Sequence, residues 1–310
     1  SDAASGTTPY TLGFRKAFKV TNGNQTSGAG ASDQIQIIYW IEAQDIANSG
    51  WNYKSSSSFL TFSFWIKSSV AQVFNFYVQS GDGTEKNMPF STPSLSADTW
   101  TKVEVQIKGD SGIDFNNDNG HGLGLYLAPY LGTDYTSNSL TNGEWVTYAS
   151  ATRYKDLATT WYTTNDATVE YTGLQLEVGS VATDFEHTSY ADTFLKCQRY
   201  YHVLLDSRIH ENTYWHEGYY YTAGMIQVIG RFTPEMRATP SSSVTSGTDY
   251  YRFYRSGSYD ALDDFLNAHT SKNSYRLYNL DDASGTAGVA GAFYLHTSGV
   301  FKLIAFDAEL

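Results

Sequence analysis

Cysteine is nearly absent from this sequence, since its 310 residues include only Cys197. A single thiol can form neither an internal disulfide nor a cluster of thiolate metal ligands. The fold must therefore be held together by packing and by hydrogen bonds. So little cysteine is typical of a protein assembled in a reducing cytoplasm, and such a protein can later work outside the cell.

Charge is also scarce, and positive charge is scarcer than negative. Charged residues make up 17% of the chain, where 20 Lys and Arg stand against 32 Asp and Glu. The net charge is −12 and the pI is near 4.9. No cluster of Lys and Arg interrupts this negative field, which repels a phosphate backbone. We expect no nucleic-acid partner.

Long hydrophobic runs and enzyme motifs are missing. No apolar stretch approaches the ~20 residues of a transmembrane helix, so we expect no membrane insertion. The sequence has no Gly-x-Ser-x-Gly nucleophile motif and no Gly-rich phosphate loop followed by Lys. His210 and His216 are six residues apart, whereas the zinc-protease motif needs a spacing of four. We therefore expect that the protein is not an enzyme.

Aromatic residues are abundant, and many of them follow a two-residue alternation. The chain has 25 Tyr, 17 Phe and 7 Trp. In the segment TKVEVQIK, Val103, Val105 and Ile107 alternate with polar residues, as in a strand with one buried face. Gly, Asn and Ser clusters separate such segments along the whole chain. This pattern predicts an all-β fold built as β-sandwiches or jelly rolls.

One segment breaks the strand pattern and divides the chain. Tyr190, Phe194, Cys197 and Tyr201 recur at helical spacing, which predicts a helix with Cys197 as a small apolar residue on its packing face. The expected organisation therefore has four parts along the chain. They are a linker or attachment remnant at 1–9, a jelly-roll sandwich at 10–190, a connecting helix at 191–201, and a smaller β-sandwich at 202–310.

Aromatic side chains near predicted loops are candidates for binding sugars. Tyr and Trp offer flat apolar faces with a polar tip, which suits stacking on sugar rings. For any single residue, packing in the core is the simpler explanation, because aromatic residues favour strands. As a set they predict a glycan-binding or subunit interface. The candidates are Trp51, Tyr53, Tyr130, Tyr135, Trp145, Trp161 and Trp215.

A calcium site is a second hypothesis. In DFNNDNG, Asp114, Asn116 and Asp118 occupy positions 1, 3 and 5 of a calcium-loop pattern. Position 6 is Asn119 rather than Gly, and position 12 is Leu125 rather than Glu, so the EF-hand pattern fails. A turn held by Asx side chains explains the segment more simply.

Several motifs resemble the carbohydrate-binding-module-like jelly roll of tail-fibre and minor structural proteins of tailed bacteriophages. The most specific is GLQLEVGSVATDFEHTSYADTFLKCQRYY at 173–201, and the C-terminal half adds FTPEMRATPS at 232–241 and the ending FDAEL. Shorter matches come earlier in the chain. They are GFRKAFKV, IEAQDIANSGW, LTFSFWIKSS, WTKVEVQIKGDSG and NDNGHGLGLYL.

The resemblance implies a virion protein that is assembled in the host cytoplasm and exposed outside. It would be a homotrimeric tail fibre or appendage that contacts other virion proteins and recognises a host cell-surface glycan. Related jelly rolls hold a structural calcium near a Glu-Ala-Glu motif, in which Glu42 matches the first Glu but Gln44 replaces the second. Two alternatives remain: a structural virion protein without receptor contact, and a surface-polysaccharide depolymerase.

Overall fold

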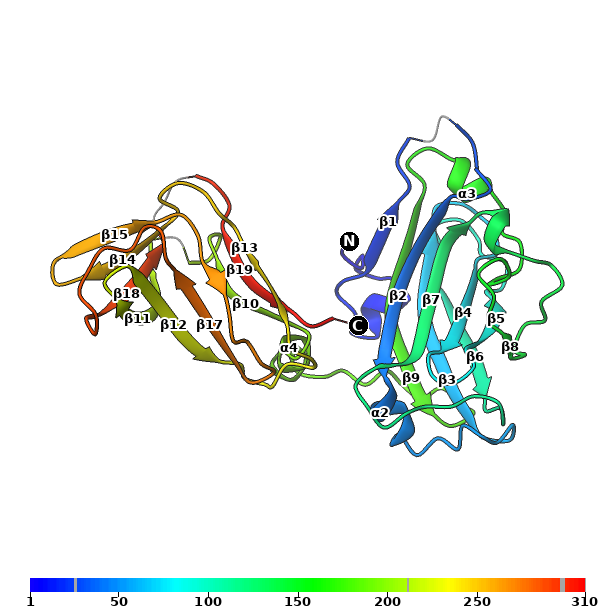
Figure 1. Cartoon of the computed structure of the whole chain (residues 1–310). Helices are drawn as coiled ribbons and strands as arrows, with labels where there is room; N and C mark the ends of the chain where they lie inside the picture. Colours follow the sequence, from blue (N-terminus) through cyan, green and yellow to red (C-terminus); the bar gives the residue numbers. More distant parts are fainter. Residues whose placement is uncertain (25–26, 211, 296–298, 310) are drawn as a thin grey trace. The chain divides into compact units, whose positions relative to one another are not determined.

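The computed structural model describes residues 1–24, 27–210, 212–295 and 299–309 (Figure 1). Strands dominate both halves of the chain, and the helices are short. The predicted all-β sandwich architecture is therefore confirmed. The chain divides into two compact units, Ser1–Glu186 and His187–Leu310, which we call unit 1 and unit 2.

Unit 1 is a sandwich of two antiparallel sheets. One sheet has the strand order β1-β9-β3-β6 and the other has the order β2-β7-β4-β5-β8. The strands are β1 (Phe18–Thr21), β2 (Gln34–Glu42), β3 (Phe59–Ser68), β4 (Asn75–Ser80), β5 (Lys86–Ser91), β6 (Thr101–Lys108), β7 (His121–Leu131), β8 (Val146–Thr147) and β9 (Thr168–Val178).

The core of unit 1 follows from the alternation in its strands. In β6, Val103 and Ile107 are buried while their neighbours are more exposed, as the sequence pattern predicts. Aromatic rings from both sheets meet between them. The rings of Phe64 from β3 and Phe76 from β4 lie edge to face with centroids 5.3 Å apart. Such edge-to-face packing fills the space between the sheets.

Short helices and the N-terminal segment complete unit 1. The helices are α1 (Thr8–Thr11), α2 (Ala43–Ala47), the 3-10 turn η1 (Thr133–Tyr135) and α3 (Thr160–Thr163). The first residues, expected to be a linker, are hydrogen-bonded within this unit. The Ser1 amino group donates to the Ala17 carbonyl oxygen over 3.0 Å, and the Ala3 N–H donates to the Arg15 carbonyl oxygen over 3.0 Å.

Unit 2 also consists of two antiparallel sheets. A three-stranded sheet has the order β10-β19-β13, and a seven-stranded sheet has the order β15-β14-β18-β11-β12-β17-β16. The strands are β10 (Tyr201–Asp206), β11 (Tyr214–Thr222), β12 (Met225–Arg231), β13 (Ser241–Val244), β14 (Tyr251–Arg255), β15 (Ser258–Leu262), β16 (Leu266–Asn267), β17 (Ser274–Asn279), β18 (Ala290–Leu295) and β19 (Leu303–Asp307).

The two sheets of unit 2 share one core. Tyr275 from the large sheet packs against Phe306 from the small one, with ring centroids 4.8 Å apart. Phe253 and Phe293 on neighbouring strands are fully buried in the same core, with ring centroids 4.8 Å apart. Side chains that alternate with these core residues point to the opposite face of the seven-stranded sheet.

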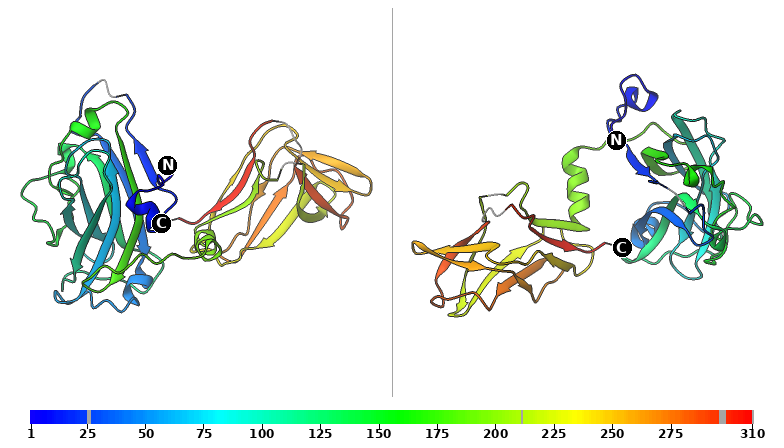
Figure 2. Two further views of the ribbon diagram at one scale, coloured as in Figure 1. Left: turned by 180° about the vertical axis from the view of Figure 1, so that it is seen from behind. Right: turned by 90° about the horizontal axis from the view of Figure 1, so that it is seen from above.

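The predicted connecting helix is present as α4 (Tyr190–Gln198), which leads into β10 (Figure 2). The Ser189 hydroxyl caps it by accepting a hydrogen bond from the Asp192 N–H over 3.1 Å. The assignment of Cys197 to a packing face was wrong, because no residue of α4 is buried and Cys197 is exposed. No described helix has the length and apolar composition needed to cross a membrane.

Gly291 in β18 allows a close approach between strands. A Cβ atom at this position would overlap the carbonyl oxygen of Tyr254 on β14. We expect Gly291→Ala to lower the free energy of unfolding by about 1–3 kcal/mol, because one of the two strands must move. Urea denaturation measures this loss. The matched control Ala290→Ser, at the exposed neighbouring position, should change stability far less, and equal losses would contradict the steric explanation.

Candidate functional site

Three of the aromatic glycan-binding candidates lie in the core of unit 1. The exposed fractions of Trp51 and Tyr130 are 3%, and that of Trp161 is 0%. Tyr130 stacks on Tyr162 with ring centroids 4.2 Å apart. A sugar ring can stack only on an aromatic face that solvent reaches, so the burial of these three residues removes them from the candidate set.

The other four candidates, Tyr53, Tyr135, Trp145 and Trp215, are half-buried. The Trp145 indole donates to the Lys108 carbonyl oxygen over 2.7 Å, and the Tyr53 ring lies 5.0 Å from that of Phe115. Tyr135 lies under the guanidinium of Arg153. In unit 2, Trp215 packs against the core residues Phe265 and Phe293. Each ring is thus engaged by the protein itself.

Each of the calcium candidates has a hydrogen-bond or ion-pair partner within the protein. Asp114 is ion-paired with Lys54, and the Asn116 amide donates to Asp82 over 2.7 Å. Glu42 and Asp118 are linked instead through Gln44, whose side chain donates to Glu42 and whose N–H donates to the Asp118 carbonyl oxygen. Among the described residues, no three His, Cys, Asp or Glu side chains are grouped so that they could hold a metal ion.

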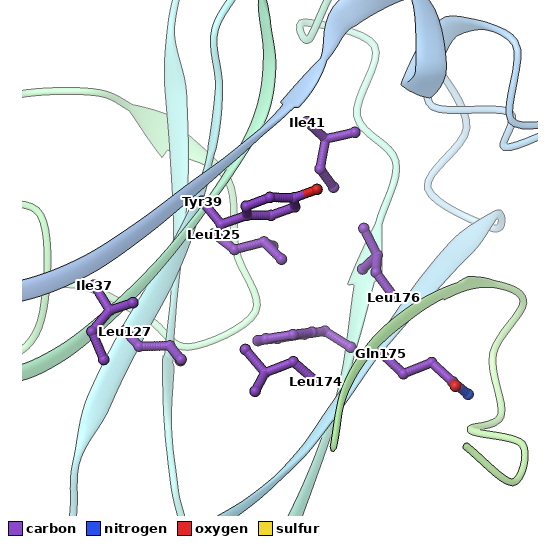
Figure 3. A pocket seen from close by; sticks show the side chains of 9 residues that line it. Ile37, Tyr39, Ile41, Leu125, Leu127, Leu174, Gln175 and Leu176 are labelled. Atoms are coloured by element: carbon purple, nitrogen blue, oxygen red, sulfur yellow. The ribbon is translucent and has the colours of Figure 1, made fainter. Parts of the chain in front are cut away.

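Unit 1 contains an apolar pocket of about 410 Å³ between its two sheets. Figure 3 shows side chains of β2 and β7 facing those of β9, with Gln175 pointing away from the opening. The lining residues are Ile37, Tyr39, Ile41, Phe62, Leu125, Leu127, Leu174, Gln175 and Leu176. In this lining Tyr39 and Gln175 carry the side-chain polar groups and the other seven residues are apolar, so the pocket is better suited to apolar groups than to a glycan.

The outer face of the seven-stranded sheet in unit 2 has a different character. Two adjoining depressions of about 590 and 640 Å³ share His216, Glu217 and Ala292 in their lining. Small residues of β18, Ala290 and Ala292, form the floor, because their side chains do not rise above the sheet. We call these two depressions together the tyrosine-flanked groove.

On one side of the groove lies a group of tyrosines whose rings contact one another. Tyr254 lies beside Ala292 in the strand register. Its ring centroid is 5.4 Å from that of Tyr294, 5.2 Å from that of Tyr259 and 6.0 Å from that of Tyr214. Tyr214 and Tyr259 are 61% and 44% exposed, so ring surface in this group remains available to a ligand.

A second group lies on the other side of the groove. Tyr219 pairs with Gln227, and the Gln227 amide donates to the Tyr219 hydroxyl. Gln227 also pairs with Tyr278 on the next strand. Ile229 and Tyr219 line the groove directly, and both are exposed. The groove therefore has aromatic groups on both sides and a low centre that carries Glu217.

A network of polar side chains fixes the β14–β15 hairpin, which carries Tyr254 and Tyr259 of the first tyrosine group. The Tyr220 hydroxyl donates to Asp260, and Arg255 donates to both residues, with its Nη2 3.0 Å from Asp260 Oδ1. Burial, with a further contribution from the Asp260 carboxylate, raises the pKa of Tyr220 to about 12, although Arg255 opposes this. Tyr220 is therefore a neutral donor at physiological pH. Its hydrogen bond ties β15 to β11 beneath the groove.

The glycan-binding candidates chosen from the sequence include one residue of this region, Trp215. In β11 the side chains of Tyr214 and Glu217 point outward. Trp215 lies between them in the sequence but points into the core, because the pairing of β11 with β18 is irregular at this position. The sequence pattern that could have pointed to this face of the sheet is Tyr-Arg-apolar-Tyr, which occurs at 251–254 and again at 275–278. In a strand, such a sequence places its Arg and its last Tyr on one face.

Comparisons with known proteins add little. No family model matches the chain, and no curated protein matches it. Among solved structures, it is similar to "Family 16 Carbohydrate Binding Module-2" at 14% sequence identity, over 53% of this chain and 77% of that chain. The TM-score is 0.26, so the likeness carries no argument about function.

The burial of Trp161 predicts a structural role. Trp161→Ala should lower the free energy of unfolding of unit 1 by about 3–5 kcal/mol, because it leaves a cavity in the core. The comparison variant Trp145→Ala removes a half-buried ring and should cost clearly less. Chemical denaturation followed by tyrosine and tryptophan fluorescence measures both. A stable Trp161→Ala protein with weakened glycan binding would restore Trp161 as a ligand contact.

Proposed function

We propose that the protein is a non-catalytic binding protein that recognises a glycan on a host-cell surface. The observation that supports this most is the tyrosine-flanked groove of unit 2. It is a shallow, open depression on a β-sheet, with aromatic rings on both sides and small residues between them. Sites built on strands hold their contact residues more precisely than sites built on loops.

The chemistry of the groove suits a sugar chain. A pyranose ring has an apolar face that packs on a Tyr ring, and a rim of hydroxyl groups that need hydrogen-bond partners. Tyr219 and Tyr254 supply flat apolar surface with a polar tip. Glu217 at the centre is exposed and supplies an acceptor for hydroxyl donors. The open form of the depression fits a chain that continues beyond both ends.

The resemblance to bacteriophage tail-fibre proteins supports a place for this function in the virion. In this proposal the protein is a homotrimeric tail fibre or appendage, attached to other virion proteins and used for adsorption to the host. Three copies that act together would convert weak contacts with single sugars into useful avidity. Static light scattering of the purified chain should then report three times its 34.5 kDa mass, and a stable monomer would contradict the trimer.

A structural role in the virion is the second candidate, and one observation favours it. Helix α4 exposes Tyr190, Phe194 and Leu195, of which Tyr190 is 82% exposed. Exposed apolar side chains grouped on one short element are typical of a surface that another subunit covers. An image of the intact particle separates the candidates. An adhesin presents unit 2 to solvent, whereas a purely structural subunit has that face covered by neighbours.

The glycan-binding proposal predicts a specific loss of affinity. Tyr219→Ala and Tyr254→Ala should each weaken binding to host-surface polysaccharide about tenfold, or about 1.4 kcal/mol, because each removes one stacking surface. Biolayer interferometry on immobilised polysaccharide measures this loss. Tyr39→Ala is the matched control, since it removes an exposed Tyr beside the apolar pocket of unit 1. If Tyr39→Ala abolished binding and the unit 2 variants retained it, the groove would not be the glycan site.

A further inference from the structure

Two strands on opposite sides of the groove carry the same tetrapeptide pattern. Tyr-Arg-Phe-Tyr at 251–254 lies in β14, and Tyr-Arg-Leu-Tyr at 275–278 lies in β17. The first and third residues of each are buried in the core. The alternation of strand side chains therefore places Arg252 and Arg276 on the outer face, each two positions away from an outward Tyr.

Arg276 is held in place by neutral groups. Its Nε donates to the Gln227 side-chain oxygen over 2.6 Å. Its guanidinium lies 5.1 Å from the ring centroid of Tyr278 and 5.6 Å from that of Tyr221. Among the described residues, no carboxylate is ion-paired with it. The positive charge is thus fixed in position but not neutralised.

Arg252 is held in the same manner on the other side. Its guanidinium lies 4.4 Å from the ring centroid of Tyr259, and its Nη1 is 3.5 Å from the Tyr254 hydroxyl. Its Nε is buried and has no hydrogen-bond partner within the part of the chain that the structure describes. No salt bridge to a described carboxylate is formed. A guanidinium held against aromatic rings and without a counterion is well suited to a planar carboxylate.

The charge on this face is opposite in sign to that of the whole protein. Outward positions of the seven strands carry Arg231, Arg252 and Arg276 against one acidic residue, Glu217. The formal balance is positive on a chain whose net charge is −12. Four strand spacings separate β14 from β17, which is roughly 19 Å. One extended oligosaccharide, but not one monosaccharide, can reach both arginines.

We propose that the tyrosine-flanked groove binds an acidic polysaccharide, with its carboxylates held by Arg252 and Arg276 and its sugar rings packed between the two tyrosine groups. This inference rests on the proposed glycan-binding function and specifies its ligand class. Glu217, at the centre of the groove, accepts hydrogen bonds from sugar hydroxyls. Its negative charge disfavours a carboxylate of the polysaccharide at that point. The favoured ligand is therefore a polymer whose carboxylates are spaced along the chain.

The test compares each acidic polymer with its own neutral form. Alginate and polygalacturonate are immobilised beside their carboxyl-reduced derivatives, with dextran and a panel of neutral bacterial surface polysaccharides as further ligands. The full chain should bind the native polymers at least about tenfold more tightly than the reduced forms. Added salt should weaken this binding, because exposed charges are screened.

Matched variants assign the effect to the groove. Arg252→Gln and Arg276→Gln should each weaken binding to the native acidic polymers about tenfold, and Glu217→Gln should strengthen it a few-fold. Arg15→Gln is the control, because Arg15 also lies over a tyrosine, Tyr10 at 4.1 Å, but in unit 1. Circular dichroism and thermal unfolding establish that each variant is folded. Glu217→Gln, whose expected effect has the opposite sign, cannot be explained by loss of structure.

The outcomes separate this inference from the proposed function. Equal binding to native and reduced polymers, or binding to neutral polysaccharides alone, would overturn the acidic ligand class and leave glycan recognition intact. Binding to acidic polymers that neither arginine variant weakens would overturn the assignment to this groove. Absence of binding to every acidic and neutral polysaccharide would overturn both the inference and the glycan-binding proposal.

Discussion

Packing of aromatic rings between two antiparallel sheets is the interaction on which both units depend. The protein has one cysteine, so an internal disulfide cannot replace this packing. Phe64 against Phe76 in unit 1 and Tyr275 against Phe306 in unit 2 each join opposite sheets. Because neighbouring residues of a strand point to opposite faces, fixing these rings inward also fixes which side chains face solvent.

The outer face of unit 2 is a consequence of that constraint. Once Phe253 and Phe293 occupy the core, Arg252, Tyr254 and Ala292 have to lie on the other side of the same sheet. Pairing between strands then brings together residues that are far apart in the sequence. Glu217 lies beside Ala292, which is 75 positions later. The groove is therefore made by the strand register rather than by any local motif.

The two units offer surfaces of different chemistry. The pocket of unit 1 is lined mainly by apolar side chains, which come from strands of both its sheets (Figure 3). The groove of unit 2 is open and has Tyr214 and Tyr219 in its lining, and Arg252 and Arg276 lie on the same face of the sheet to either side of it. Desolvating sugar hydroxyls without hydrogen-bond partners is costly, which favours the second surface for a glycan. In unit 1, the candidate tryptophans Trp51 and Trp161 are buried and belong to its core.

The sequence by itself determined the all-β class and the presence of a helix after residue 190, because alternation and helical spacing are local properties. It could not decide which aromatic residues face solvent. From the sequence, Trp161 and Tyr254 are both simply aromatic residues. In the structure Trp161 is fully buried, whereas Tyr254 belongs to the group of contacting tyrosines beside the groove. Only the tertiary structure decided this, since exposure depends on which sheet covers which face. The register of seven strands placed two distant Tyr-Arg-apolar-Tyr segments on one surface.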